Sequence, residues 1–315
     1  MLKNYWPFVV LVLVTAIAGC GQQNISGPQV VEVFPAQGYH GFKKSDVITI
    51  KFDRPININS FLEAYDSTSD GLMPDQVSYA FLDEGKTVVI KPGKPLAYSP
   101  DDSYANFGFE VGTELIDLDG HHMKEPLRVT FTTMRTLTAN IYCAEDLDGT
   151  VSGQQAVNDQ SAIYVGDNAS NAGMVGFLAY PWPADSDGVI AAALHLYVAG
   201  INNTPFTDLG SLTIEPVDIG DGLDPTDVTS TPILAPTVTD DGSGWDTGST
   251  PSYDVGEYAK AAWDLGLTRL DLRLRFDKTT DNDGKSDSVV LLSREAEDAV
   301  DNEMLQILEL TYYGP

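Results

Sequence analysis

Cysteine is scarce in this chain of 315 residues, which contains Cys20 and Cys143 and no other thiol. Cys20 follows the small residues Ile17-Ala18-Gly19, which come after a cationic start at Lys3 and an apolar run from Phe8 to Val14. This order is typical of a cleaved export signal. The apolar run is shorter than the roughly 20 residues of a membrane-spanning helix. We therefore expect residues 1–19 to be removed.

The segment that ends at Cys20 resembles the signal of bacterial lipoproteins. The resemblance implies that Cys20 becomes the first residue, carries the acyl chains and is followed by a tether over residues 20–27. Several chains would give durable membrane anchoring, because each buried methylene contributes about 0.8 kcal/mol. With Cys20 lipidated, Cys143 has no partner for an intramolecular disulfide. Gly21 is not the aspartate of inner-membrane retention, so we expect the outer membrane. The alternative is an ordinary secretory signal with a chance cysteine.

Basic residues are also few, with 18 Lys+Arg against 46 Asp+Glu and a net charge of −28. Residues 1–137 carry 11 basic and 16 acidic side chains, which leaves 7 and 30 for the rest of the chain, a net charge of −23. Such a surface repels nucleic acid and attracts divalent cations. We expect no nucleic-acid partner. A merely soluble or salt-tolerant surface is the alternative.

Motifs that support catalysis are missing as well. The chain has no nucleophile elbow, no phosphate loop and no Cys-His pair in a supporting context. The four histidines are His40, His121, His122 and His195. None has a helical partner or a nearby cysteine, so zinc is not expected. Carboxylates are too numerous for an acid and base pair to be singled out. We expect no catalytic residues and no enzyme, with Cys143 a small buried hydrophobe.

The first half of the mature chain has the pattern of a small all-β sandwich. Val47 to Phe52 alternates between apolar and polar residues, as a half-buried strand does. Thr87 to Lys91, Ala105 to Val111 and Leu127 to Thr133 repeat this style. Prolines and glycines between these segments punctuate the strands and leave no room for long helices.

Several segments of this half resemble the bacterial Ig-like domain of S-layer and other surface proteins. They are Val30 to Pro35, Ile48 to Pro55, the turn Asp117-Leu118-Asp119-Gly120 and Val129 to Thr133. The resemblance covers Pro28 to about Met134, and we place the domain at residues 28–136. It implies a spacer or an adhesive module without catalytic residues.

A brief linker, Arg135 to Ala139, is expected before a second β-rich region. Ile190 to Val198 and Leu212 to Ile214 predict strands there, and Asp254 to Leu265 predicts the one short helix. Arg269 to Phe276 alternates strictly. We expect its leucines and Phe276 to face inward and Arg269, Asp271, Arg273 and Arg275 to form a solvated face, not an anion site.

Further segments of this half resemble the disaggregatase-related (DNRLRE-type) β-sandwich modules. They are Leu272 to Phe276, Ser293-Arg294-Glu295, Leu305 to Tyr313, Ile163 to Gly166, Gly176 to Leu178 and Ile190 to Tyr197. The resemblance implies a jelly-roll-like sandwich, placed at residues 137–315, and some relatives bind polysaccharides. This chain lacks the usual basic residue after Gly176. The expected fold class is therefore all-β, with two β-sandwich domains, Ig-like and then jelly-roll-like.

The chain contains four Asp-x-Asp-Gly turns, which begin at Asp117, Asp146, Asp185 and Asp281. Aspartate and glycine suit tight turns, and we interpret the first three as turns alone. The last adds Asp287 to Asp281 and Asp283, a spacing that lets a loop wrap oxygen atoms around calcium. It is no EF-hand, because Val290 stands where a bidentate glutamate belongs. A plain turn is the alternative to a calcium site at Asp281, Asp283 and Asp287.

Two tryptophans are candidates for ligand stacking. Trp182 lies between two prolines, and Trp245 lies in a loop rich in Gly, Ser, Thr and Asp. Alternatively, each ring plugs an end of a sandwich or covers a sheet edge. The sequence as a whole predicts a lipid-anchored envelope protein that binds a polysaccharide or another surface partner and is stabilised by calcium. A purely structural spacer, and an accessory subunit of a polysaccharide-degrading system, are the alternatives.

Overall fold

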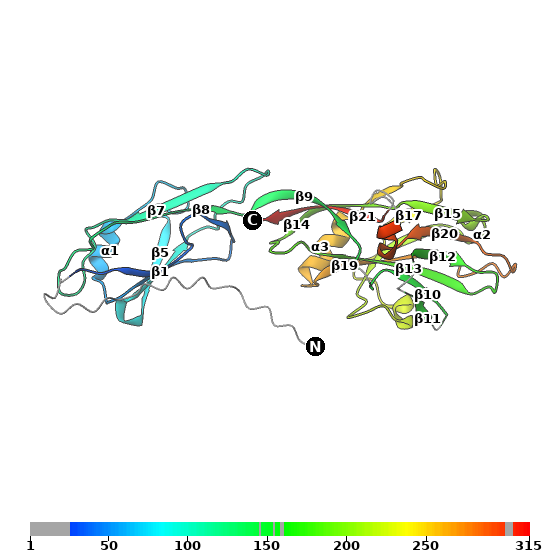
Figure 1. The fold of residues 1–315 in the computed structure, drawn as a ribbon, viewed down its shortest axis with the longest axis horizontal. Coiled ribbons are helices and arrows are strands. Elements are labelled where there is room, and N and C mark those ends of the chain that lie inside the picture. The colour runs from blue at the N-terminus through cyan, green and yellow to red at the C-terminus, as the bar shows by residue number, and fades with distance from the viewer. Residues whose placement is uncertain (1–25, 145, 154, 158–160, 300–304) are drawn as a thin grey trace.

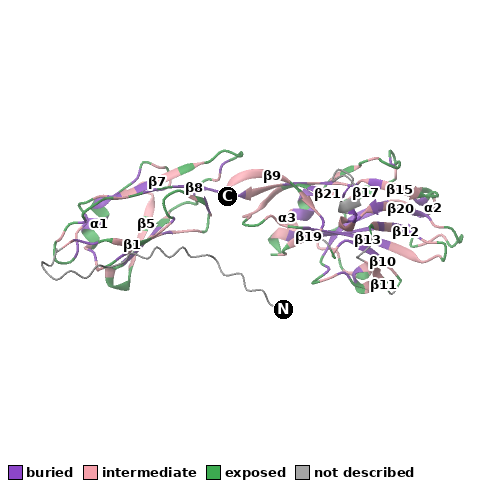
Figure 2. Cartoon of the chain, in the orientation of Figure 1, coloured by how far each residue is buried: buried purple, intermediate pink, exposed green. Residues whose placement is uncertain are grey.

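The computed structural model describes residues 26–315 except residues 145, 154, 158–160 and 300–304. The described chain forms two β-sandwich domains that follow one another along the long axis of the molecule (Figure 1). Exposed residues gather in the loops, and buried residues lie along the strands inside each domain (Figure 2). The expected signal at 1–19, Cys20 and most of the tether lie outside the described residues.

The first domain consists of two four-stranded sheets. One has the order β1 (Val30–Phe34), β3 (Ile48–Phe52), β6 (Thr87–Pro92) and β5 (Val77–Leu82); the other has β2 (Tyr39–Phe42), β8 (Leu127–Thr133), β7 (Asn106–Val111) and β4 (Tyr65–Asp66). In β3 the alternate residues Ile48, Ile50 and Phe52 are buried, as the sequence pattern predicts. These residues join one core with side chains from both sheets.

A helix that the sequence analysis did not predict, α1 (Ile58–Ala64), closes one side of this core. Asn57 caps it by accepting a hydrogen bond from the Ser60 amide at 3.1 Å. Phe61 and Ala64 are the apolar residues of this helix that are buried. The short 3₁₀-helix η1 (Asp83–Gly85) connects β5 and β6. With only two turns, α1 is too short for a helical period to stand out in the sequence.

The second domain packs a large sheet on a small one. The nine-stranded sheet has the order β15 (Val198–Asn202), β20 (Ser288–Leu292), β12 (Ala162–Asp167), β13 (Gly173–Pro181), β19 (Arg269–Phe276), β16 (Leu212–Val217) and β17 (Val238–Asp240), with β10 (Gly149–Ser152) paired to β13 and to β11 (Gln155–Val157). The small sheet has the order β18 (Ser252–Asp254), β14 (Val189–His195), β21 (Ile307–Gly314) and β9 (Arg135–Tyr142). Helices α2 (Pro205–Asp208) and α3 (Gly256–Asp264) and the 3₁₀-helices η2 (Pro225–Thr229) and η3 (Arg294–Ala299) complete it. The expected helix is α3, but it is not the only one.

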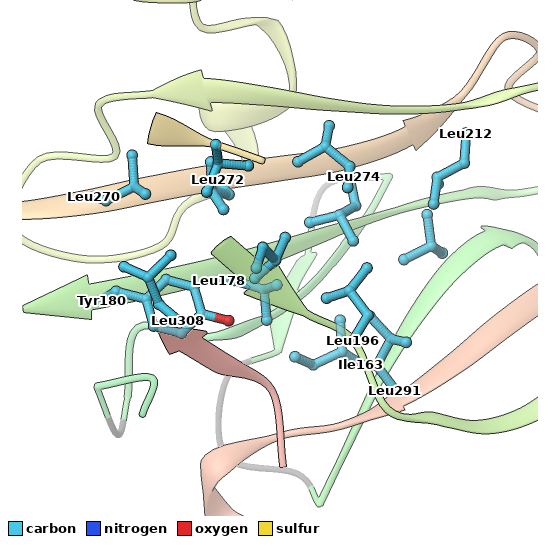
Figure 3. Packing of buried hydrophobic residues seen from close by; sticks show 14 of the residues in the cluster. Ile163, Leu178, Tyr180, Leu196, Leu212, Leu270, Leu272, Leu274, Leu291 and Leu308 are labelled. Atoms are coloured by element: carbon cyan, nitrogen blue, oxygen red, sulfur yellow. The ribbon is translucent and has the colours of Figure 1, made fainter. Parts of the chain in front are cut away.

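The core of the second domain lies between these two sheets. Leu270, Leu272 and Leu274 project from β19 into it, where Figure 3 shows them gathered with Tyr180 of β13 and Leu308 of β21. All five side chains are fully buried. Burial of such side chains contributes roughly 1.5–3 kcal/mol each, so this layer is a main source of the domain's stability.

The other face of β19 is buried in its middle and partly exposed only at Arg269 and Arg275, which corrects the expectation of a solvated face. Arg273 is 3% exposed and Asp271 is 2% exposed. A second apolar cluster covers this face and contains Phe177 and Val217 from the neighbouring strands and Ile219 from the loop before η2. The sheet is therefore buried on both sides here. Ion pairs and hydrogen bonds offset the cost of burying the charged residues of β19, as described below.

The two domains meet without a linker. A single residue separates the end of β8 at Thr133 from the start of β9 at Arg135. The segment expected to be a linker is therefore part of a sheet. Across the junction the Tyr98 hydroxyl donates to Asp187, and the Lys44 ammonium lies over the Tyr98 and Tyr313 rings at 4.2 and 5.0 Å. These contacts tie the loop between β13 and β14 and the end of β21 to the first domain.

Candidate metal centre

Three carboxylates from two separate segments meet at one end of the nine-stranded sheet. Asp281 and Asp287 lie in the connection between β19 and β20, and Asp208 is the last residue of α2. Carboxylate oxygens of the three lie within 4.8 Å of one another. The loop reaches this shape through two residues with positive φ, Asn282 at 64° and Gly284 at 76°. The Asp281 carboxylate also accepts a hydrogen bond from the Asp283 amide at 3.0 Å.

Asp287 is the most constrained member of this group. It is 1% exposed, and its Oδ1 accepts a hydrogen bond from the Thr204 amide at 3.1 Å, while its Oδ2 is buried and has no hydrogen-bond partner. Burial, and then the charges of Asp208, Asp283 and Asp167, raise the pKa of Asp287. A buried oxygen without a partner costs about 1–3 kcal/mol or more. A cation at this point would remove that cost.

Asp167, at the end of β12, adds a fourth carboxylate beside Asp287. It is fully buried, and its Oδ1 accepts a hydrogen bond from the Asp287 amide at 3.1 Å. Its Oδ2 has no hydrogen-bond partner either. Two neighbouring buried carboxylates with free oxygens form an arrangement that hard divalent cations stabilise, and calcium accepts irregular sets of 6–8 oxygen ligands.

The residues brought together differ from those predicted. Asp281 and Asp287 belong to the group, whereas Asp283 lies outside it and pairs with Lys285 at 2.5 Å. Asp208 takes its place. The sequence carried no signal for Asp208, because it is distant in the chain and only the pairing of β15 with β20 brings α2 next to this loop. Tertiary structure, not local spacing, selects the donors.

A second group with suitable residue types is Asp117, Asp119 and His121. Here Asp117 is buried, and its carboxylate accepts hydrogen bonds from the amides of Asp119 and His121 at 3.0 and 2.9 Å. It also lies 3.1 Å from Nδ1 of His121 and 3.6 Å from the Arg54 guanidinium. Its oxygens are fully used by the protein. This group therefore has the character of a capped turn.

Neither predicted tryptophan presents a free ring. Trp245 is 6% exposed, its Nε1 donates to the Tyr253 hydroxyl at 3.1 Å, and its ring packs edge-on against Phe206. The burial of Trp245 corrects the expectation of a stacking surface, because the loop folds back over the core. Trp182 is half-buried, donates to the Leu267 carbonyl at 2.7 Å and packs against Trp263. Both rings cover ends of the sandwich.

Cys143 is buried, and burial raises the pKa of its thiol, so the thiolate form is strongly disfavoured. His40 lies 2.9 Å from the Thr132 hydroxyl, and His122 lies 3.1 Å from the Thr113 carbonyl. In the described part of the chain no helix is long and apolar enough to cross a membrane.

Comparison with protein families gives a match over the first domain. Residues 24–133 match the family described as the bacterial Ig-like domain. A comparison with curated proteins found no match.

Solved structures give only distant likenesses. The N-terminal part of the bacterial S-layer protein SbsC is 12% identical with a TM-score of 0.24, over 48% of this chain and 40% of that one. Alpha-2-macroglobulin from Escherichia coli is 8% identical with a TM-score of 0.27, over 90% and 70%. A structure of carbohydrate-binding modules of the β-sandwich superfamily is 8% identical with a TM-score of 0.15, over 92% and 94%. The chain thus spans about 40% of the first of these, and the scores carry no argument about function.

Proposed function

We propose that this protein is a non-catalytic module of the bacterial cell envelope, anchored through lipid on Cys20, whose second domain is held in its binding or spacing form by calcium. The match of residues 24–133 to the bacterial Ig-like domain supports a surface role. The export signal and Cys20 support the anchor and the outer membrane. The oxygens of Asp281, Asp287 and Asp208 support the ion.

One observation carries the calcium part of this proposal. Asp287 keeps a buried oxygen without a hydrogen-bond partner within a group of three carboxylates. Four acidic residues surround this point when Asp167 is included, in a half of the chain with a net charge of −23. Their repulsion opposes closing the end of the sandwich. Calcium bound there would offset this repulsion and join α2 to the β19–β20 loop.

The test is thermal unfolding of the mature chain, with Cys20→Ser to keep it soluble. An ion that binds only the folded state at a hundredfold excess over its Kd adds roughly 2.7 kcal/mol, a rise of about 5–10 °C for a domain of this size. We expect millimolar calcium to give such a rise. We expect Asp208→Asn and Asp281→Asn each to remove most of it.

Asp283→Asn is the matched control, because it changes the same charge in the same loop outside the carboxylate group. Its calcium response is expected to remain. Magnesium is expected to stabilise less, since it demands a stricter octahedral shell. The calcium proposal is contradicted if calcium and magnesium raise the melting temperature equally, or if Asp208→Asn and Asp281→Asn both keep the full calcium response. Either result would show that the ions only screen a charged surface.

The junction favours a spacer as the second candidate function. Tyr98, Asp187 and Lys44 join the domains directly, which suits a stiff rod that holds another part at a distance. A glycan-binding screen of the soluble form separates the two functions. Binding of a defined polysaccharide supports the binding module, and a blank screen supports the spacer.

A further inference from the structure

A cavity of about 460 Å³ opens on the face of the nine-stranded sheet that points away from the main core. Glu215 of β16 and Arg273 and Arg275 of β19 form its floor. The end of η2 and the loop after it, residues 228–232, form one wall, and the end of β19 and the residues after it, 276–279, form another. Its volume lies within the usual range of small-molecule sites.

Two guanidinium groups share one carboxylate at the floor. Glu215 is fully buried; Arg273 donates to it through Nη2 at 2.5 Å, and Arg275 donates through Nε. Arg273 Nη1 also donates to the carbonyls of Asp227, Val228 and Ser230, each at 2.9 Å. Both carboxylate oxygens of Glu215 are thus paired, and the bonds hold the two arginine side chains in position.

The two arginines retain unused donors. Arg273 Nε is buried and has no hydrogen-bond partner. The Arg275 side chain is 43% exposed and lines the cavity, and among the described residues Glu215 is the group that its guanidinium pairs with, through Nε. Its two terminal nitrogens are therefore available to a ligand. A guanidinium in this state presents a fork of N–H groups that fits a carboxylate.

The charge balance of the cavity is positive within a strongly acidic domain. Lys278 lines it and donates to the Asp208 carbonyl at 2.7 Å, and Asp277 lines it and accepts a hydrogen bond from the Ser211 amide at 2.9 Å. With Glu215, the cavity has three cations and two anions. The buried charges of Glu215 and Arg273 balance each other, and Arg275, Asp277 and Lys278 are exposed or partly exposed. The net positive charge therefore lies at the open side of the cavity, where a small anion can reach it. The two carboxylates would repel a dianion more strongly than a monoanion.

We propose that this cavity binds a small organic carboxylate, with the carboxylate on the free donors of Arg275 and the hydroxyl groups of Thr229 and Thr231 facing the rest of the ligand. The site goes beyond the function proposed above. It does not depend on bound calcium, because its floor lies on Glu215, Arg273 and Arg275, which are not part of the carboxylate group at Asp287. It would give the second domain a specific ligand without any catalytic step.

The test uses gluconate, with sorbitol as the probe that lacks the carboxylate and inorganic phosphate as the dianionic probe. Binding to the soluble full chain is measured by calorimetry at low salt. We expect gluconate to bind with a millimolar Kd and sorbitol not to bind. Arg275→Gln is expected to weaken gluconate binding by at least about tenfold, because it removes the exposed charged fork. Arg128→Gln, which changes an exposed arginine of the first domain, is expected to bind as the parent chain does.

Arg275→Gln is expected to keep the rise in melting temperature that calcium gives the parent chain. This result would show that the variant is folded, and it separates this proposal from the calcium proposal. Lys278→Gln is the second variant, and it is expected to weaken gluconate binding without removing it. The proposal is overturned if gluconate does not bind at tens of millimolar, if sorbitol binds equally, if phosphate binds more tightly, or if neither substitution changes the Kd.

Discussion

At the scale of single residues, four Asp-x-Asp-Gly turns with the same letters play four different parts. Asp117 caps its own turn, and Asp187 accepts a hydrogen bond from the Tyr98 hydroxyl across the domain junction. Asp281 joins the candidate calcium site. Asp148 is fully buried and accepts a hydrogen bond from the Arg294 amide at 2.8 Å, while its Oδ1 has no hydrogen-bond partner. Burial and long-range partners, not turn chemistry, separate the four.

Asp148 gives a pH prediction. Burial, and then the nearby Glu295 carboxylate, raise its pKa to about 7. In the unfolded chain Asp148 loses its proton near pH 4, so between about pH 4 and 7 the unfolded state releases a proton that the folded state keeps. Stability therefore falls as pH rises through this window. The full loss is on the order of 4 kcal/mol above pH 7.

The measurement is urea unfolding of the parent chain and of Asp148→Asn from about pH 4 to pH 8. The amide keeps the acceptor for Arg294 and cannot ionise. We expect the difference in unfolding free energy to move in favour of Asp148→Asn as pH rises. A difference that stays constant over this range contradicts the raised pKa.

The candidate calcium site shows how far local sequence spacing reaches. Asp281 and Asp287 were predicted because they lie within one loop. Asp208 was not predicted, and Asp283 was predicted wrongly as a member of the group. A sequence gives the spacing of loop residues but not the direction of their side chains, and here Asp283 pairs with Lys285 outside the carboxylate group. Donors from another element become visible only when the sheet order is known.

At the scale of elements, β19 is the strand around which the second domain is built. Its leucines fill the main core, and Asp271 and Arg273 lie beneath a second apolar layer. Strict alternation predicted the strand at Arg269–Phe276 and its inner face. The outer face was predicted to be solvated because alternation of charged and apolar residues is the usual mark of a half-exposed strand. Ion pairing with Glu215 on β16 could not be seen from β19 alone.

Glu215 carries the prediction for this element. Glu215→Ala leaves the buried Arg273 guanidinium and the partly exposed Arg275 guanidinium without their carboxylate. We expect a loss of about 3–5 kcal/mol of unfolding free energy, mainly from the uncompensated buried charge of Arg273. Glu110→Ala is the matched control, since Glu110 pairs with Arg128 on the surface of the first domain. We expect a much smaller loss there, because both partners of this pair are exposed to solvent. Similar losses in chemical denaturation of the two variants would show that the buried pairing contributes nothing special.

Strand existence was more predictable than strand pairing. Val47–Phe52, Leu127–Thr133 and Arg269–Phe276 have long, regular alternation, and all three form strands. Short elements such as β10, β11 and α1 carry too few residues for a period, and their positions follow from what they cover. The all-β fold class with two sandwiches was thus available from sequence, whereas the second apolar layer was not.

At the scale of the whole molecule, the direct passage from β8 to β9 makes a near-continuous rod of two domains (Figure 1). Each domain has its own core. We therefore predict that residues 27–134 and 135–315 fold separately, each with the circular dichroism of β structure. A disordered fragment in either case contradicts the independence of the two cores.

The anchor is tested in cells. Cys20→Ser is expected to abolish incorporation of labelled fatty acid and to leave the protein uncleaved or misplaced, because the acyl chains have no other attachment point. Gly21→Asp is an informative companion, since an aspartate after the lipidated cysteine is expected to retain the protein at the inner membrane. Lipid labelling that survives Cys20→Ser would end the lipoprotein proposal.

The most direct test of the calcium proposal is to measure calcium binding by the soluble chain with calorimetry or equilibrium dialysis. We predict one saturable site that requires Asp208 and Asp281, so the double variant Asp208→Asn with Asp281→Asn loses it while Asp283→Asn keeps it. A calcium ion held by buried oxygens is also expected to resist monovalent salt better than ions that screen an exposed surface. The absence of a saturable site, or equal binding by the double variant and the parent chain, would contradict the claim that calcium holds the second domain.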